Sequence, residues 1–233
     1  MLEQVATALV DLAAERTVLV GIDGASASGK STFADELART LAPSGIPVVR
    51  ASIDSFHRPR AERWARGPLS PEGYYLDSHD IGRLRSALLD PFAAATGTYL
   101  PAIFDEPSDS PVDPDPMPVP DRGVLLFDGL FLHRPELAGY WHLSVLLTAD
   151  TRRDRLWQTF FERDLPDDAA ERAAELERKR TIANRYIEGQ AIYERSASPA
   201  ERASIVIDND DLAHPVILSR SDESADPNRS DHP

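Results

Sequence analysis

Residues 24–31 carry the strongest chemical signal in the sequence. They read Gly-Ala-Ser-Ala-Ser-Gly-Lys-Ser, which fits the phosphate-binding pattern G-x-x-x-x-G-K-[ST] at every fixed position. Gly24 and Gly29 permit backbone conformations and close approaches that a side chain would block, so successive N–H groups can surround a triphosphate. Lys30 would reach the β- and γ-phosphates, and Ser31 would ligate Mg²⁺. The predicted nucleotide-binding residues are Gly24, Ala25, Ser26, Ala27, Ser28, Gly29, Lys30, Ser31 and Thr32.

Two aspartates that follow apolar runs are the candidate partners of this loop. Asp128 comes directly after residues 124–127, and in phosphate-loop proteins an acid at the end of such a strand holds the metal or its water. Asp54 follows residues 46–53 and could accept a hydroxyl proton during phosphoryl transfer. The alternatives are a turn-forming Asp beside Gly129 and a loop-capping Asp54.

The elements around these residues predict a three-layer α/β fold. Apolar runs at 18–22, 46–53, 124–127, 142–147 and 204–207 read as about five parallel strands buried on both faces. Helical spacing occupies the segments between them, and alternation of strand and helix predicts helices on both faces of the sheet. The expected helices are 2–15, 31–41, 80–89, 151–162 and 169–193.

Three stretches lack this periodicity. Residues 55–78 read as a long loop with at most one short helical piece, and residues 98–104 read as extended. The Pro/Asp-rich loop 105–121 contains six acidic residues and no Lys or Arg, so we expect it to be mobile or polyproline-like. We expect one domain over residues 1–218 and a disordered tail over residues 219–233.

Composition excludes several classes. The net charge of -14 argues against a nucleic-acid partner, because such binding begins with a basic surface. The sequence has no Cys, so disulfides and thiolate metal sites are excluded. It has no secretory signal pattern and no apolar run long enough for a membrane span, which predicts a cytoplasmic protein without a membrane partner. Assembly into a homo-oligomer stays open.

The motifs together resemble the uridine kinase and phosphoribulokinase-like family of P-loop small-molecule kinases. The segments that carry the resemblance are 24–31, 53–58, 127–129, 185–186 and 207–210. It implies that Asp54 is the catalytic base. Phe56 matches the aromatic residue of the family's Asp-Ser/Asp-Phe-Tyr motif, while His57 replaces its Tyr. Asp128 stands where many relatives have Glu, a change that keeps the charge and shortens the reach to Mg²⁺.

The acceptor side departs from that family. Residues 101–105 resemble its Pro-x-Tyr-Asp segment with Phe104 in the Tyr place, but the His that reads a pyrimidine is replaced by the sequence that starts at Glu106. The aromatics Trp64, Tyr74 and Tyr75 either stack on a flat substrate or form core under the loop. The predicted substrate-contacting residues are Asp54, Phe56, His57, Tyr75 and Phe104, with His79 as a further candidate contact.

Arginines after the fourth predicted strand suggest a lid. Related kinases close a basic lid over the phosphates, and we select Arg163, within a lid of about 163–172, as a catalytic residue beside Lys30 and Asp54. Ordinary surface ion pairs with Glu171, Glu175 and Glu177 are the alternative.

These residues predict transfer of the ATP γ-phosphate, with Mg²⁺, to a hydroxyl of a small-molecule acceptor. The resemblance implies a uridine-like nucleoside; another riboside, pantothenate or a sugar stays open. A non-catalytic nucleotide-dependent switch is the second class of function, although the Asn-Lys-x-Asp sequence typical of guanine-specific switches is missing. The acidic balance counts against a nucleic-acid 5′-end kinase, the third class.

Overall fold

The core of the protein is a mainly parallel β-sheet. The computed structural model describes residues 1–149, 157–162 and 164–220. Within these residues the main sheet contains six strands: β1 (Thr17–Gly24), β2 (Val48–Ser52), β7 (Gly123–Gly129), β8 (Leu143–Thr148), β9 (Ile205–Asp208) and β10 (Val216–Arg220). Their order is β10-β9-β8-β1-β7-β2, and all neighbours are parallel except β10 and β9. The predicted parallel sheet is confirmed, with one antiparallel edge strand added.

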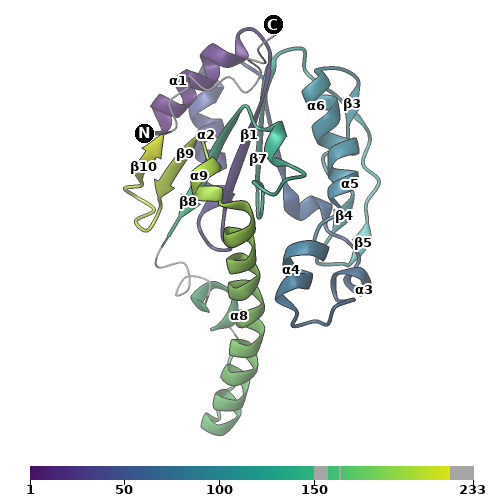
Figure 1. The fold of residues 1–233 in the computed structure, drawn as a ribbon, viewed down its shortest axis with the longest axis vertical. Coiled ribbons are helices and arrows are strands. Elements are labelled where there is room, and N and C mark those ends of the chain that lie inside the picture. Colours follow the sequence, from purple (N-terminus) through teal and green to yellow (C-terminus); the bar gives the residue numbers. More distant parts are fainter. Residues whose placement is uncertain (150–156, 163, 221–233) are drawn as a thin grey trace, which may run out of the picture.

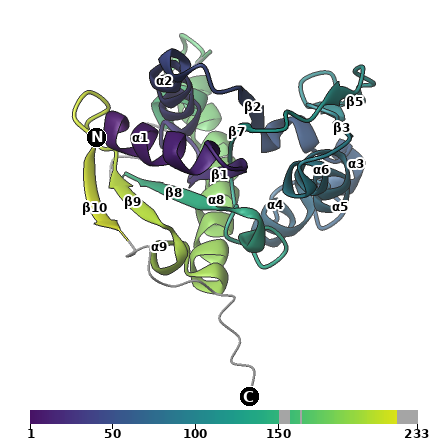
Figure 2. The same ribbon diagram turned by 90° about the horizontal axis from the view of Figure 1, so that it is seen from above.

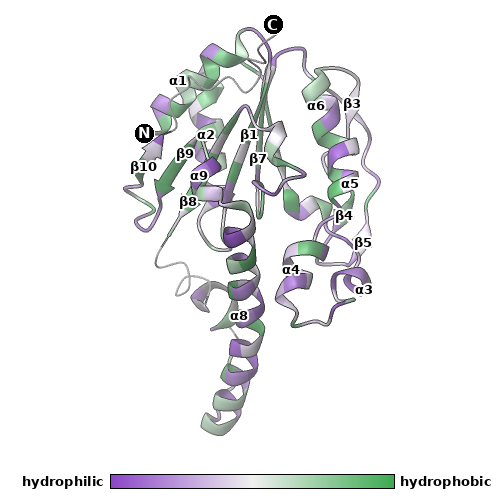
Figure 3. Ribbon diagram, in the orientation of Figure 1, coloured by the Kyte–Doolittle hydropathy of each residue, from purple (hydrophilic) through white to green (hydrophobic). Residues whose placement is uncertain are grey.

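Helices cover both faces of this sheet, as predicted. Alternate residues of β1 point to opposite sides, so Val18 and Val20 join one buried cluster while Leu19 joins another. The first cluster includes α1 (Leu2–Ala13) and α2 (Lys30–Leu41); the second includes α5 (Ile81–Leu84), the five-residue π-helical turn η3 (Arg85–Leu89) and α6 (Asp90–Ala94). Figures 1 and 2 show the two groups of helices on either side of the strands, and Figure 3 shows hydrophobic residues along the strands.

The region after the second strand differs from its prediction. The strand ends at Ser52, and Asp54 lies in the 3₁₀ turn η2 (Ile53–Phe56), whose start is capped by the Ser52 side chain accepting from the Asp54 N–H at 3.3 Å. The expected loop contains two helices, α3 (Arg60–Arg63) and α4 (Pro71–Asp77). Ser70 caps α4 by accepting from the Gly73 N–H at 3.0 Å. Ser70 and Pro71 are therefore a helix-start signal that was visible in the sequence.

The Pro/Asp-rich stretch is folded rather than free-standing. Its two short strands, β5 (Ser110–Pro111) and β6 (Met117–Pro118), pair with β4 (Phe104–Asp105) and β3 (Thr98–Tyr99), respectively. Arg63 of α3 forms ion pairs with Glu106 and Asp109 of this stretch. The structure thus gives this stretch partners in distant segments, which local sequence does not reveal, and its mobility stays a prediction.

The C-terminal part is dominated by the long helix α8 (Ala169–Ala197). Asp168 caps its start by accepting from the N–H groups of Ala170 and Glu171, both at 2.9 Å. In Figure 1 this helix runs from the sheet to the far end of the molecule, beside α4. The helix predicted over residues 151–162 is described only from residue 157, as the π-helical turn η5 (Trp157–Phe161). The shorter elements are η1 (Ala42–Ser44), η4 (Ala138–Tyr140) and α9 (Pro199–Arg202).

The last strand extends into the predicted C-terminal tail. The tail expected from residue 219 begins inside β10, and residues 221–233 lie outside the described part of the chain. No helix among the described residues combines the length and the apolar character that a membrane span needs.

Candidate active site

The phosphate loop has the geometry that its sequence predicts. It connects β1 to α2, and Gly29 adopts a φ of 89° at the start of that helix. A Cβ on Gly29 would lie 2.6 Å from Asn209 Nδ2, and a Cβ on Gly24 would lie 2.6 Å from the Leu147 carbonyl oxygen. Ala27 is also left-handed, with a φ of 63°. The loop therefore requires glycine at both fixed positions, for conformation and for space.

Lys30 and Ser31 are the first residues of α2, and they lie near Asp23 of β1 and Asp128 of β7. Ser31 Oγ donates to Asp128 Oδ2 at 2.7 Å, and Arg50 Nη2 lies 2.9 Å from Asp128 Oδ1. Lys30 Nζ donates to the Ala25 carbonyl at 2.9 Å. Desolvation lowers the pKa of Lys30, while the nearby carboxylates of Asp54, Asp23 and Asp128 act in the opposite direction.

The Ser31 and Asp128 pair fits a magnesium site. Mg²⁺ takes oxygen ligands and usually keeps several waters, so one hydroxyl and one carboxylate beside bound phosphates are sufficient protein ligands. Register explains why the pair meets. Asp128 lies opposite Ile22 of β1 in the parallel ladder, two residues before the loop begins. Mg²⁺ held by this pair would supply positive charge that offsets the phosphates of a bound nucleotide.

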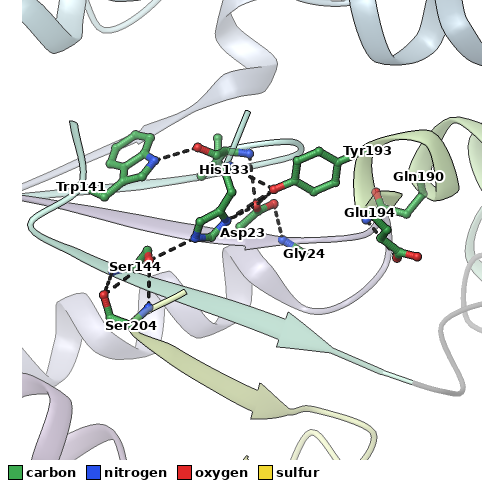
Figure 4. A network of polar contacts seen from close by, with 10 residues as sticks. Asp23, Gly24, His133, Trp141, Ser144, Gln190, Tyr193, Glu194 and Ser204 are labelled. Atoms are coloured by element: carbon green, nitrogen blue, oxygen red, sulfur yellow. Dashed lines mark hydrogen bonds and ion pairs between the residues drawn. The ribbon is translucent and has the colours of Figure 1, made fainter. Parts of the chain in front are cut away.

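A buried polar network fixes the base of the phosphate loop. Asp23 is fully buried, and its Oδ1 accepts from the Gly24 N–H at 2.7 Å. Its Oδ2 accepts from the Leu132 N–H at 3.1 Å and from His133 Nδ1 at 2.7 Å. The hydroxyl of Tyr193, from α8, also donates to Asp23. Figure 4 shows these side chains converging beneath the loop, with His133 continuing to Ser144 and Ser204. The network links α8 to the loop, and sequence reasoning missed it.

One cavity of about 990 Å³ brings most of the predicted site residues together. The phosphate-loop residues that line it are Ser26, Ala27, Gly29, Lys30, Ser31 and Thr32. Asp54, His57, Phe104 and Asp128 line it as well. Gly24, Ala25 and Ser28 lie buried behind this surface. Asp54 is exposed, and of the carboxylates that raise the pKa of Lys30 it has the largest effect, so a potential base lies near the phosphate-binding lysine.

Two predicted substrate contacts do not reach this cavity. Phe56 is fully buried in the sheet core, 6.5 Å from the Phe127 ring centroid. Tyr75 packs in a separate aromatic cluster against Phe131 and Tyr193. Its neighbour Tyr74 lines the cavity instead, because adjacent residues of α4 face different sides of the helix. Neither Phe56 nor Tyr75 lines this cavity, so the predicted substrate contacts that the structure brings together are Asp54, His57 and Phe104.

The tyrosine that does face the cavity contacts the phosphate loop. The Tyr74 hydroxyl and Ser26 Oγ are 3.2 Å apart, and burial raises the pKa of Tyr74. The Arg185 guanidinium lies over the rings of Tyr74 and Tyr186, at 5.5 and 5.7 Å from their centroids. Arg185 lines the cavity, is 8% exposed, and its Nε has no hydrogen-bond partner among the described residues. This places a buried positive charge beside the loop.

Only part of the predicted lid lies within the described residues. Arg163, the arginine selected as catalytic, lies outside the described residues. Arg172 donates to the carbonyl oxygens of Pro166 and Asp167, and Arg178 and Arg180 form ion pairs with Glu175 and Glu177. The surface ion pairs expected as the alternative are thus present for Arg178 and Arg180. Arg185 is the cavity-lining arginine of α8 within the described part of the chain.

A second group of side chains meets near Asp54. One carboxylate oxygen of Asp54 and one ring nitrogen each of His57 and His79 lie within 4.8 Å of one another. The two rings are 4.6 Å apart between centroids, and their backbones form an isolated antiparallel bridge. Such a set can accept several hydrogen bonds or hold a cation. Sequence spacing gave no sign of it, because the 21 residues that separate the two histidines include α3 and α4.

The fold and the loop together define the class of the protein. A parallel sheet with a phosphate loop after β1 and an acid at the end of the adjacent β7 is the architecture of the P-loop nucleotide-binding proteins. The predicted fold class is confirmed.

Solved kinase structures share this fold. One is a possible uridine kinase from Bacillus stearothermophilus, 23% identical, with a TM-score of 0.66 over 88% of this chain and 96% of that one. A proposed fructose transport system kinase from Silicibacter sp. TM1040 is 21% identical, with a TM-score of 0.60 over 82% and 94%. D-glycerate 3-kinase from Cryptococcus neoformans is 12% identical, with a TM-score of 0.58 over 94% and 99%. No protein-family description and no curated protein matches the chain.

Proposed function

We propose that this protein is an ATP-dependent kinase that phosphorylates a hydroxyl group of a small molecule. The observation that carries the proposal is the single cavity that joins Lys30, the Ser31 and Asp128 pair, and the Asp54 carboxylate. A nucleotide switch needs only the loop and the metal ligands, whereas a carboxylate beside the phosphate-binding lysine, without an ion-pair partner among the described residues, is what a kinase needs as a base. The acceptor that we propose is nucleoside-like, and another riboside, pantothenate or a sugar is the alternative.

Each residue then has a role in phosphoryl transfer. The acceptor oxygen forms a bond to the γ-phosphorus while the bond to the oxygen bridging the β- and γ-phosphates breaks, so ADP leaves. Asp54 orients the acceptor hydroxyl and takes its proton as the new bond forms. Lys30 and Arg185 offset the negative charge of the transferred group. Mg²⁺, when held by Ser31 and Asp128, would neutralise charge on the phosphates.

Measuring ADP release with Mg·ATP tests the proposal. The acceptor panel contains nucleosides, vitamin ribosides, pantothenate and sugars. At least one acceptor should raise ADP release above background. Asp54→Asn should lower kcat by about 10²–10⁴-fold, the range for loss of a general base, while ATP still binds.

Asp11→Asn is the matched control, because Asp11 is an exposed aspartate of α1 far from the cavity lining. It should keep full activity. If Asp54→Asn is as active as Asp11→Asn, Asp54 is not the base. If every acceptor leaves ADP release at background, the nucleotide-dependent switch becomes the better assignment.

A further inference from the structure

The charge balance of the cavity wall opposite the nucleotide constrains the acceptor. This wall consists of the cavity-lining residues from segments 54–78 and 104–107, which we call the acceptor wall. Arg63 is its cation. Arg63 is 7% exposed, and it is already engaged: Nη1 lies 2.7 Å from Glu106 Oε1 and Nη2 lies 3.2 Å from Asp109 Oδ1. Two carboxylates therefore neutralise the guanidinium that could otherwise bind an anionic substrate.

Two further carboxylates of the acceptor wall have no such compensation. Asp105 accepts from the N–H and the hydroxyl of Ser108, an uncharged residue, and these bonds hold its pKa below the ordinary value. Asp54 forms no ion pair with any described residue. Lys30 is near Asp54, but in the proposed reaction its charge serves the triphosphate.

Arg185, over the ring of Tyr74, serves the triphosphate in the proposed reaction, as Lys30 does, and the arginines that flank Arg63 do not change the balance. Arg58 does not line the cavity, and its Nη1 lies 3.7 Å from Glu62 Oε2. Arg60 lies near Asp109 and over the ring of Trp64. Even when Arg60 is counted against Asp109, Asp54 and Asp105 leave the wall with two negative charges. An acceptor with its own carboxylate or phosphate would meet repulsion here.

The same wall presents hydrogen-bond acceptors. His57 Nδ1 is 2.8 Å from the Asp54 carbonyl oxygen, which can only accept, so Nδ1 donates this bond and Nε2 is the ring nitrogen left to meet a ligand. His79 packs beside His57 but does not line the cavity; it is 1% exposed, and within the described part of the chain neither of its ring nitrogens has a hydrogen-bond partner. Burial lowers the pKa of His79, so this neighbour adds no positive charge to the wall. The Asp54 carboxylate and a neutral His57 ring therefore offer acceptors to donors on one ligand.

We propose that the acceptor is a hydroxyl-rich molecule that carries no negative charge, and that the acceptor wall discriminates against carboxylate-bearing and phosphate-bearing acceptors. Neighbouring hydroxyls of such a molecule would donate to Asp54 and His57. This inference rests on the kinase function proposed above. It separates the alternatives left open there: uncharged nucleosides and sugars fit the wall, and pantothenate does not.

Matched pairs of acceptors test the proposal. The pairs are uridine and orotidine, panthenol and pantothenate, glycerol and glycerate, and ribulose and ribulose 5-phosphate, each measured as kcat/KM for ADP release. In every pair that turns over, the uncharged member should be preferred by at least about tenfold. That is the order of the effect of one unit charge at about 10 Å with an effective dielectric constant of about 20.

The failures of the two proposals give different results. Preference for an anionic member overturns the present inference and leaves the kinase function standing. Turnover with no member of any pair contradicts the kinase function, and the inference with it.

One variant tests whether the negative charge of the acceptor wall causes the preference for uncharged acceptors. Asp105→Asn removes a charge but keeps an oxygen that can accept from Ser108, and it should lower the preference for the uncharged member by about tenfold. Asp113→Asn is the control, since Asp113 is an exposed aspartate of the same Pro/Asp-rich stretch that does not line the cavity. Its preference should match that of the unmodified protein. An unchanged preference in folded Asp105→Asn would overturn the electrostatic explanation.

Discussion

The hydroxyl of Tyr193 should contribute far more to stability than its size suggests. Tyr193 is fully buried, its hydroxyl donates to the buried carboxylate of Asp23, and it accepts from the His133 N–H at 3.0 Å. Tyr193→Phe keeps the ring and its packing while removing both bonds. A hydrogen bond to a charged group contributes about 1.5–3 kcal/mol, and the stranded His133 N–H costs about 1–3 kcal/mol. The free energy of unfolding should therefore fall by about 3–5 kcal/mol.

Urea denaturation followed by circular dichroism measures this loss, with thermal unfolding as a second readout. The melting temperature should fall by about 10 °C, because one kcal/mol corresponds to about 2–4 °C for a chain of this size. Tyr75→Phe is the matched control. Tyr75 is a buried tyrosine of the same aromatic cluster, but among the described residues its hydroxyl has one hydrogen bond, which it accepts from Ser196 Oγ at 3.3 Å. It should lose about 0.5–1.5 kcal/mol. Equal losses in the two variants would refute the role given to the Asp23 network.

Two further variants probe the packing and the protonation of the fold. Gly189→Ala in α8 would place a Cβ 2.6 Å from Tyr74 Cδ1, so we expect the free energy of unfolding in urea to fall by about 1–3 kcal/mol. Gly139→Ala is the control, because nothing lies within 4 Å of the added Cβ, and it should be nearly neutral. Similar losses in both variants would contradict the close contact at Gly189. His142 accepts from the Leu19 N–H at 3.0 Å, and burial lowers the pKa of this histidine below 6.5. The unfolded chain therefore binds the proton more readily than the folded chain does. The free energy of unfolding should fall as the pH drops below about 6.5, by at most about 1.4 kcal/mol per pH unit. His142→Asn should lose less stability than the unmodified protein between pH 7 and pH 5, and an identical loss would rule out this histidine as a cause.

The structure changes the interpretation of the loop after Asp54 more than any other region. We expected a long irregular segment, and the chain instead forms α3 and α4, which place Arg63 and Tyr74 at the cavity and bring His79 back beside His57. The elements are short, and their apolar residues are too few to produce a clear helical period. Ser70 and Pro71 were the available signal, as a cap followed by a proline at the first helical position.

The sequence by itself determined the nucleotide side of the protein. A phosphate loop depends on residue types at fixed neighbouring positions, so Gly24, Gly29, Lys30 and Ser31 identify it without any knowledge of distant contacts. The strands on either side were equally visible, because strands buried on both faces are continuous apolar runs.

Only the tertiary structure decided the acceptor side. Phe56 proved to be core, Tyr74 rather than Tyr75 faced the cavity, and Arg63 was neutralised by carboxylates more than 40 residues away in the chain. Which face of a short helix is buried, and which charges meet, depend on packing between distant segments. Local residue spacing carries no information about those contacts, so the charge of the acceptor wall could be read only from the folded chain.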